Sequence, residues 1–529
     1  MITGKNFIGY TASANTSTPF LSTIPGSGNT ATPCSFYEAT AAEINAAATL
    51  AGQAFTIYRQ KSPAQKIDFL ETIAAIITAQ KDELVAMAMH ETHLPKPRLD
   101  GEVQRTINQI KLFAGFLQEG SWVKAIIDTA QPDRAPLPKP DIRQMQIGIG
   151  PVGVFGASNF PFAFSVAGGD TISALAAGCT VVCKAHPGHP ATSEMVASII
   201  LEAAKTTDMP DGVFSLLQAR QNQASIQLVS HPAIKAIGFT GSLTGGKALF
   251  DAAAKREEPI PVYAEMGSVN PVFILPEIIQ QQPDTLAAKL AASNLLSAGQ
   301  FCTNPGIIVS IEGPATHQFS QHFSLCIQNA GADDMLTSGI ANNYYKHIQQ
   351  LQQSPLVTAL AQGKINDGVL QATPYLFTVS AKTALAQPTL LEEVFGPSSI
   401  HIMAANEAEL YAVATQLSGQ LTTSLWGTET DLAANALLVQ ILELKAGRII
   451  FNNVPTGVEV THAMVHGGPY PATTDSKTTS VGTNAIYRFT RAVCYQNCPQ
   501  HLLPQALQNN NQQQLWRLVN GAYSNDSIE

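Results

Sequence analysis

Short apolar strands alternate with helices in the central part of this 529-residue chain. Residues 152–156 are predicted to form a buried strand, residues 168–177 a helix, and residues 179–184 a second buried strand. A strand–helix–strand unit of this kind is right-handed, and its two strands run parallel. Ligands of such sheets bind beyond the carboxyl ends of the strands, where Asn159 and Lys184 fall. Both are candidate binding residues, although a turn former at Asn159 and a solvated strand end at Lys184 explain them equally well.

The next two strands end in residues that suit phosphate binding and acid–base chemistry. Residues 236–242 are predicted to be a strand that runs into a helix, whose free N–H groups favour an anion. Gly241 and Ser242 lie at this bend, where a glycine also serves backbone geometry alone. The strand at residues 261–267 carries Glu265 at its end, and a carboxylate in that position needs partners. Catalysis and a structural ion pair both remain open for Glu265.

A single cysteine stands between a small-residue turn and a proline. Cys302 follows residues 297–299, where a helix is expected to end, and precedes Pro305 and a strand at residues 306–309. A thiol in such a turn can have its pKa lowered by nearby donors, as a nucleophile requires. Because free cysteine is also among the most buried residue types, a filler of the core or the turn is the alternative.

Length and charge limit the classes of function. A chain of 529 residues is expected to form two or three domains, and a net charge of -9 argues against nucleic acid as a partner. Seven scattered cysteines predict no disulfide framework and favour a reducing compartment. Residues 1–22 lack the apolar core of a secretory signal, and the longest apolar run is too short to span a bilayer. We therefore expect a cytoplasmic protein without a membrane partner.

Other stretches carry no chemistry of their own. Four prolines within residues 131–140 predict a linker or an edge excursion. The glutamine- and asparagine-rich tail from residue 505 is predicted to be helical around Trp516. No cysteine or histidine spacing matches a metal site, so no metal is expected. Three segments with helix-period apolar residues are predicted to be surface helices: residues 41–54, 62–92 and 99–119.

The candidate residues occur in an order that resembles the aldehyde dehydrogenase superfamily over nearly the whole chain. Four motifs in order, at about the family's spacing, are far more specific than one motif. The resemblance implies an α/β fold with two Rossmann-like domains and a small β flap for oligomerisation. The four motifs are GFTGS at residues 238–242, EMG at 265–267, GQFC at 299–302 and EVFGP at 393–397.

The same resemblance implies domain boundaries and an assembly. A homodimer or a homotetramer is expected, joined through the flap. The boundaries are a cofactor-binding domain of residues 1–130 and 148–265, a catalytic domain of residues 266–484, a flap of residues 131–147 with 485–505, and a tail of residues 506–529.

The resemblance also gives each candidate residue a role in oxidising a small aldehyde. Cys302 would attack the aldehyde carbon, and the Asn159 amide with the Cys302 N–H would hold the oxyanion. Hydride transfer to a nicotinamide would leave a thioester, which water activated by Glu265 would hydrolyse. The cofactor would be bound by Lys184 at the adenosine ribose, Gly241 and Ser242 at the pyrophosphate and Glu393 at the nicotinamide ribose, with Gly246 and Phe395 in the same site.

Two departures from the family pattern bear on specificity. Ser158 stands where many members have a tryptophan, which predicts a less aromatic substrate tunnel. Pro187 stands where NAD-preferring members have a glutamate that would repel a 2′-phosphate. Because Lys184 and Arg220 could close on that phosphate, NADP is the predicted cofactor, with NAD also accepted. A Pro187 that only shapes the loop and a solvated Arg220 are the alternative.

Further segments resemble one subgroup, the 2,5-dioxovalerate (α-ketoglutarate semialdehyde) dehydrogenases. The expected reaction is therefore oxidation of 2,5-dioxovalerate to 2-oxoglutarate, with an NADP-linked fatty aldehyde dehydrogenase as the alternative. An acylating dehydrogenase is disfavoured because such members generally lack the base that Glu265 provides. Intact Cys302 and Asn159 disfavour a non-catalytic scaffold. The segments of the subgroup are residues 184–190, 455–460, 466–469 and 478–483.

Overall fold

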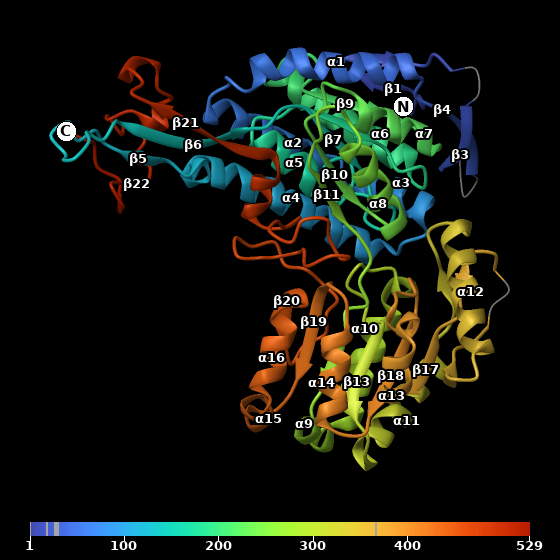
Figure 1. Cartoon of the computed structure of the whole chain (residues 1–529). Coiled ribbons are helices and arrows are strands. Elements are labelled where there is room, and N and C mark those ends of the chain that lie inside the picture. The colour runs from blue at the N-terminus through green and yellow to red at the C-terminus, as the bar shows by residue number, and fades with distance from the viewer. Residues whose placement is uncertain (1, 17–18, 26–30, 366–367) are drawn as a thin grey trace.

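The computed structural model describes residues 2–16, 19–25, 31–365 and 368–529, and two large sheets organise this part of the chain (Figure 1). The strands of the first sheet are β1 (Asn6–Ile8), β2 (Thr11–Ser13), β7 (Val152–Phe155), β8 (Val181–Lys184), β9 (Phe214–Leu217), β10 (Ala236–Thr240) and β11 (Val262–Glu265). Their order is β11-β10-β7-β8-β9-β1-β2, and the first five run parallel. Strands β7 and β9 are buried along their whole length, as expected where helices cover both faces of a sheet.

Helices enclose this first sheet, and Figure 1 shows α1 lying across its upper side. Helix α2 begins with Ser62 and Gln65 in a reciprocal capping box and with Pro63 in the first turn, which confirms the predicted place of that proline. The helices are α1 (Ala41–Tyr58), α2 (Pro63–Ala79), α3 (Lys81–Thr92), α4 (Lys96–Glu119), α5 (Gly169–Ala176), α6 (Pro190–Thr206), α7 (Asn222–Ser230) and α8 (Leu243–Ala254).

The second sheet repeats the pattern from residue 272 onward and forms the lower body in Figure 1. Its strands, in sheet order, are β15 (Thr358–Gln362), β17 (Tyr375–Ser380), β18 (Ser398–Ala404), β13 (Ile307–Ile311), β12 (Val272–Ile274), β19 (Gln420–Trp426) and β20 (Ala446–Phe451). All neighbours run parallel except the edge strand β15. Two parallel α/β units confirm the predicted fold class.

Shorter elements complete the second unit. A two-stranded ladder joins β14 (Asp333–Asp334) to β16 (Gln371–Ala372). The helices of this unit are α9 (Pro276–Gln281), α10 (Pro283–Leu295), α11 (Pro314–Asn329), α12 (Ser338–Gln353), α13 (Ala381–Ala386), α14 (Glu407–Gln416), α15 (Glu429–Ala434) and α16 (Ala436–Glu443), with the 3-10 turns η2 (Leu296–Gly299) and η3 (Pro388–Leu391).

A third sheet projects from the first unit and carries the carboxyl terminus, at the left of Figure 1. Its order is β21 (Thr490–Gln496), β6 (Ile142–Gly148), β5 (Ile126–Asp128), β22 (Arg517–Val519) and β23 (Ala522–Ser524). Residues 131–140 leave this sheet as an excursion closed by a bridge between Gln131 and Lys139. The 3-10 turns η4 (Thr483–Phe489), η5 (Gln500–Leu502) and η6 (Gln505–Leu507) lead into and beyond β21, and η1 (Ser121–Val123) precedes β5.

The predicted helix around Trp516 is wrong. Strand β22 pairs with β5 in parallel and with β23 in a tight hairpin, so the tail extends the third sheet. Buried Arg517 fixes this conformation, because its guanidinium donates to the carbonyls of Gln508 and Asp526. These tertiary partners override the local preference of a polar segment that has no apolar periodicity.

Near the amino terminus, a hairpin of β3 (Pro19–Pro25) and β4 (Ala31–Tyr37) packs beside α3. Within the described ranges, no helix combines the length and the apolar character needed to cross a membrane.

Candidate active site

The carboxyl edge of the first sheet gathers most of the predicted residues. Asn159 follows β7, Lys184 ends β8, Gly241 follows β10, and Glu265 ends β11. Because these four strands are adjacent and parallel, their ends lie along one edge, where ligands of such sheets bind. Cys302 reaches the same place from the second unit, in the turn between α10 and β13.

The turn that carries Cys302 has an unusual backbone. The helix predicted to end at Gly299 ends at Leu295, and Ser297 and Ala298 in η2 both take left-handed conformations. Gly299 also has a positive φ of 65°, and a Cβ there would lie 2.3 Å from the carbonyl oxygen of Gly396. Such conformations persist only where the surroundings impose them, and they cluster at functional sites.

Asn270 holds this turn from the start of β12. Its side-chain amide donates to the carbonyls of Cys302 and Asn304, each at 2.9 Å, and to that of Ser268 at 3.1 Å. Gln300 adds a second anchor, because its amide donates to the carbonyls of Ser297 and Asp334. The thiol is thus carried on a backbone that is fixed on both sides.

A buried hydrogen-bond chain connects Cys302 to Glu265 through His466. The Sγ of Cys302 lies 3.5 Å from Nε2 of His466, and Nδ1 of His466 lies 2.7 Å from Oε2 of Glu265. Glu265 and His466 are almost fully buried, whereas Cys302 is partly exposed. Among the described residues these three are also the one group of this kind whose ligand atoms lie close enough to hold a metal ion. Their mutual hydrogen bonds suit proton transfer.

The charges along the chain are set by its surroundings. Burial alone would raise the pKa of Glu265, but His466, the Ser480 hydroxyl and Arg488 together bring that pKa below its ordinary value. Burial, assisted by the charge of Glu265, raises the pKa of the Cys302 thiol far above its ordinary value. An ionised Glu265 can only accept, so Nδ1 of His466 donates to it, and Nε2 is the ring atom that faces the thiol.

One oxygen of Glu265 remains free. Oε2 accepts from His466 and, at 2.6 Å, from the Ser480 hydroxyl, while Oε1 is buried without a partner in the described structure. Asn159 contacts the turn that carries Cys302, with its amide donating to the carbonyl of Gln300 at 3.3 Å. That amide is 8% exposed and has a second N–H that this bond leaves unused.

The start of α8 fits a phosphate group. The helix begins at Leu243, and its Ncap residue Ser242 accepts from the Gly245 N–H at 3.2 Å. The first-turn residues Leu243 and Thr244 are exposed, so their N–H groups are available to an anion at the positive end of the helix. Gly246 is buried, and a Cβ there would come within 2.7 Å of the Met266 sulfur. Its smallness therefore serves helix–strand packing.

Lys184, Pro187 and Arg220 lie along the adjacent strand ends. Burial lowers the pKa of Lys184 to about 8, partly offset by Cys183 and Glu38. Arg220 is exposed, and its backbone N–H donates to the Glu38 carboxylate at 3.0 Å. Glu38, which follows β4, was not predicted. Its carboxylate lies near Lys184 and Arg220, so this region has an acid although position 187 is a proline.

Glu393 lies on the second unit, facing the strand end after Glu265. Burial raises the pKa of Glu393 to about 7, and the Ser268 N–H lowers it in part. A Cβ at Gly267 would lie 2.3 Å from Oε2 of Glu393, so only glycine allows this approach. A carboxyl group held here suits the hydroxyls of a ribose, and Phe395 two residues on is partly exposed beside it.

A cavity of about 530 Å³ leads to Cys302 and has a wall of aromatic rings and arginines. Arg98 and Arg105 of α4, together with His466, are the functional candidates that the sequence reasoning missed. Arginines seven residues apart share one helix face, so the spacing of Arg98 and Arg105 could have indicated that both face the same site. Helix periodicity alone assigned this segment to the surface. The residues that line this cavity include Arg98, Gly101, Glu102, Arg105, Phe160, Phe164, Phe301 and Val458.

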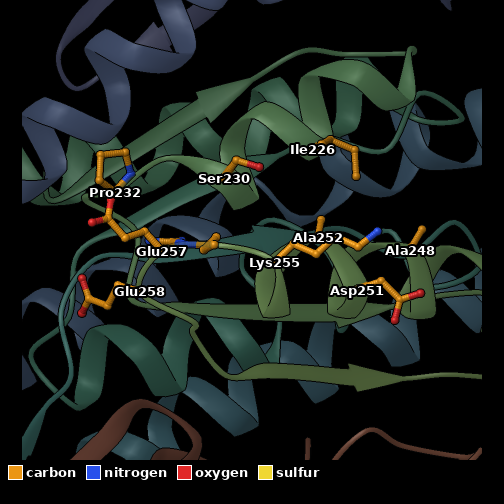
Figure 2. Close-up of a pocket in the computed structure, with 10 residues that line it drawn as sticks. Ile226, Ser230, Pro232, Ala248, Asp251, Ala252, Lys255, Glu257 and Glu258 are labelled. Atoms are coloured by element: carbon orange, nitrogen blue, oxygen red, sulfur yellow. The ribbon is translucent and has the colours of Figure 1, made fainter.

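A larger hollow of about 1020 Å³ lies between α7 and the carboxyl-terminal end of α8 (Figure 2). Ile226, Ser230 and Asp251 are among the residues that line it. None of the predicted site residues lines this hollow, whereas Cys302 lines the smaller cavity.

Sequence comparison defines the class of protein. The profile of the Aldehyde dehydrogenase family matches residues 12–491, and the chain belongs to this family. Its members oxidise aldehydes with NAD or NADP, which agrees with a nucleophilic thiol beside a dinucleotide-type strand edge. The resemblance predicted from the four motifs is thereby confirmed.

Two relatives are similar over almost their whole length. The chain is 46% identical to the alpha-ketoglutaric semialdehyde dehydrogenase of Acinetobacter baylyi over 98% of both chains. It is 45% identical to alpha-ketoglutaric semialdehyde dehydrogenase 2 of Azospirillum brasilense, over 98% of this chain and 99% of the relative. These matches confirm the predicted subgroup resemblance.

Solved structures share the fold at lower identity. A putative aldehyde dehydrogenase from Burkholderia cenocepacia superposes with a TM-score of 0.78 at 21% identity, covering 93% of this chain and 99% of that one. A 1-pyrroline-5-carboxylate dehydrogenase superposes with a TM-score of 0.77 at 20% identity, covering 93% and 92%.

Proposed function

We propose that this protein oxidises an aldehyde to a carboxylic acid through a thioester on Cys302. The observation that carries the proposal is the buried chain Cys302–His466–Glu265 beside the cavity. Because the thiol has a raised pKa and the carboxylate a lowered one, the free site is proposed to hold a protonated thiol and an ionised carboxylate on either side of His466. This is the charge arrangement of a base-activated nucleophile.

In the first step, Nε2 of His466 accepts the thiol proton as Sγ of Cys302 bonds to the aldehyde carbon. The imidazolium that forms is stabilised by the carboxylate of Glu265 at 2.7 Å. The Asn159 amide and the Cys302 N–H are the donors proposed for the oxyanion of the thiohemiacetal. Such donors are typically worth about 3 kcal/mol each when aimed at developing charge.

A bound nicotinamide dinucleotide supplies the hydride acceptor that converts the thiohemiacetal to a thioester. Lys184, the α8 start at Ser242 and the Glu393 carboxyl are proposed to hold its ribose, pyrophosphate and second ribose. Glu265 then acts as general base, since its unpartnered Oε1 can bind and deprotonate the water that hydrolyses the thioester. As the acid leaves, His466 returns its proton to the departing thiolate, and Glu265 releases the proton taken from water to solvent.

The proposed substrate is 2,5-dioxovalerate, which the reaction converts to 2-oxoglutarate. Support comes from the names of the two relatives at 46% and 45% identity. The fatty aldehyde alternative draws on the rings of Phe160, Phe164 and Phe301 in the cavity wall. A panel of aldehydes ranked by kcat/KM distinguishes the two substrates. 2,5-Dioxovalerate should have the highest value, and a clear preference for long unbranched aldehydes would favour the fatty aldehyde alternative.

NADP is the proposed preferred cofactor, with NAD also accepted. Pro187 carries no charge, while Lys184 and Arg220 are cations next to the strand ends that would receive the adenosine ribose. Glu38 opposes this preference because its carboxylate lies against the Arg220 N–H. Initial rates should show that Pro187→Glu shifts use towards NAD and that Glu38→Gln shifts it towards NADP. A parent enzyme that favours NAD by more than tenfold would refute the assignment.

The proposed assembly is a homodimer or a homotetramer joined through the third sheet. Strands β21 and β23 form its two edges, and β21 is largely exposed. Unpaired edge strands are ready templates for pairing with another chain. We also propose a cytoplasmic location, since all seven cysteines lie in the described part of the chain and are unpaired, as in a reducing compartment.

A further inference from the structure

Helix α4 presents a charged stripe to the cavity that contains Cys302. Arg98, Glu102 and Arg105 are spaced i, i+4 and i+7, so they share one face of the helix. All three line the cavity together with Gly101, where an added Cβ would meet nothing within 4 Å. The stripe is thus part of the wall and has free space beside it.

The Arg98 guanidinium is oriented by aromatic rings but is only partly hydrogen-bonded. It lies 4.4 Å from the ring centroid of Phe301 and 5.0 Å from that of Phe160. Its Nη2 donates to the carbonyl of Asn159 at 2.6 Å. Nε and Nη1 are buried and have no partner among the described residues. Buried N–H groups without partners are costly, which indicates that something else receives them.

Arg105 repeats this arrangement one step along the helix. Its guanidinium lies 4.9 Å from the ring centroid of Phe164, and Nε donates to the carbonyl of Val458 at 3.2 Å. Nη2 is buried without a partner in the described structure. Two guanidinium groups, each lying over an aromatic ring, therefore line the same cavity.

Glu102 balances these two cations only in part, because its one carboxylate raises the pKa of both guanidinium groups. Oε1 of Glu102 accepts from the N–H groups of Phe162 and Ala163, whereas Oε2 is buried without a partner in the described structure. Burial raises the pKa of Glu102 and lowers the pKa of Arg98 to about 10, which reflects the cost of charges withdrawn from water. The carboxylates of Glu265 and Glu459 also raise the pKa of Arg105, though less than Glu102 does. Glu459 is exposed, and Glu265 is paired with His466. On this face of α4, two cations therefore share one carboxylate, which leaves an excess of positive charge in the cavity wall.

We propose that Arg98 and Arg105 form an anchor for a carboxylate at the end of the substrate remote from its aldehyde. The inference rests on the proposed function and names the substrate class of that site: short aldehydes that end in a carboxylic acid. Guanidinium groups bind carboxylates through paired N–H donors, and three unpartnered donors are available here. An uncharged aldehyde would leave both cations unmatched, so the anchor also selects against apolar substrates.

The test compares glutarate semialdehyde with its methyl ester, which has nearly the same shape and no remote charge. The readout is the ratio of kcat/KM for the acid to kcat/KM for the ester. The parent enzyme should favour the acid by about 30-fold or more, the size expected of a charge-assisted contact in a buried site. Arg105→Met should lower the ratio several-fold but not to one, because Arg98 keeps its two unpartnered donors, whereas Arg105→Lys should recover part of the loss.

Lys111→Met is the matched control, because Lys111 is an exposed cation on the same helix. Its ratio should equal that of the parent. Equal rates for acid and ester in the parent would overturn the anchor without touching aldehyde oxidation itself. If the parent oxidises neither substrate, the proposed function fails instead. The ratio of the parent decides the question even where an arginine variant does not fold.

Discussion

At the scale of single residues, His466 is central to the proposed first step, although it was not among the residues predicted from the sequence. His466 bridges a neutral thiol and an ionised carboxylate, with 3.5 Å to the sulfur and 2.7 Å to the oxygen. Replacing His466 by Phe removes the proton acceptor of the first step and should lower kcat by about 100-fold, within the range of general-base effects. Steady-state rates at saturating aldehyde measure this.

The same variant should also shift the pH profile. His466 is the first of the groups that lower the pKa of Glu265, and burial acts in the opposite direction. Without His466 that pKa rises, and because Glu265 must be ionised to act as a base, the acid limb of the kcat profile should move to higher pH. An acid limb at the same pH as in the parent enzyme would contradict the pairing of His466 with Glu265.

Cys302→Ala should abolish aldehyde oxidation and leave dinucleotide binding intact, since the proposed cofactor residues belong to other elements. Loss of activity is measured by the absorbance of the reduced nicotinamide, and binding by titration of the variant. Residual turnover above about 0.1% of the parent rate would mean that another nucleophile acts, because removing a covalent nucleophile typically costs at least that much.

Sequence reasoning selected the strand-end residues because parallel strands deliver their ends to one edge. Asn159 and Lys184 were selected by that rule, Gly241 by the bend from strand to helix, and Glu265 as a carboxylate that needs partners, while their roles came from the family resemblance. Arg98 and Arg105 escaped it because helix periodicity separates apolar from polar positions and does not tell a solvated arginine from one that faces a cavity. Glu38 was missed because its contact with Arg220 joins residues 182 apart in the chain.

At the scale of elements, the turn η2 shows how backbone strain places the thiol. Gly299→Ala puts a Cβ 2.3 Å from the Gly396 carbonyl oxygen in a left-handed conformation, so it should cost about 2 kcal/mol of stability and displace Cys302. Gly313→Ala is the matched control, since an added Cβ there meets nothing within 4 Å. The unfolding temperature and kcat should both fall for Gly299→Ala and not for Gly313→Ala. Equal losses in the two variants would contradict the role given to η2.

Elements with strong signals were predictable, and short ones were not. The capped helix α2 and the apolar strands β7 and β9 carry local signals that agree with their tertiary surroundings. Strands β22 and β23 have three residues each and depend on β5 and on buried Arg517, so no local pattern announces them. The predicted helix failed there for that reason.

At the scale of the whole molecule, the tail belongs to the third sheet and bears on assembly. The predicted domain boundaries stay a proposal, and in that proposal the flap should be extended to include β5, β22 and β23. Deleting residues 506–529 exposes the edge of β5 and removes the carbonyl of Leu507 that accepts from buried Arg143. We expect a lower unfolding temperature and a smaller assembly by light scattering. A truncated protein with the parent mass and unfolding temperature would refute the flap assignment.

The most direct test of the central claim is a rapid-mixing experiment with Glu265→Gln. Acylation of Cys302 does not need a base for water, so the variant should still form one reduced cofactor per active site, more slowly because the His466 imidazolium loses its carboxylate partner, and then stop. Acid quenching followed by mass spectrometry should find the acyl group on the peptide that contains Cys302. Steady turnover near the parent rate, with no acyl group on Cys302, would contradict the thioester mechanism.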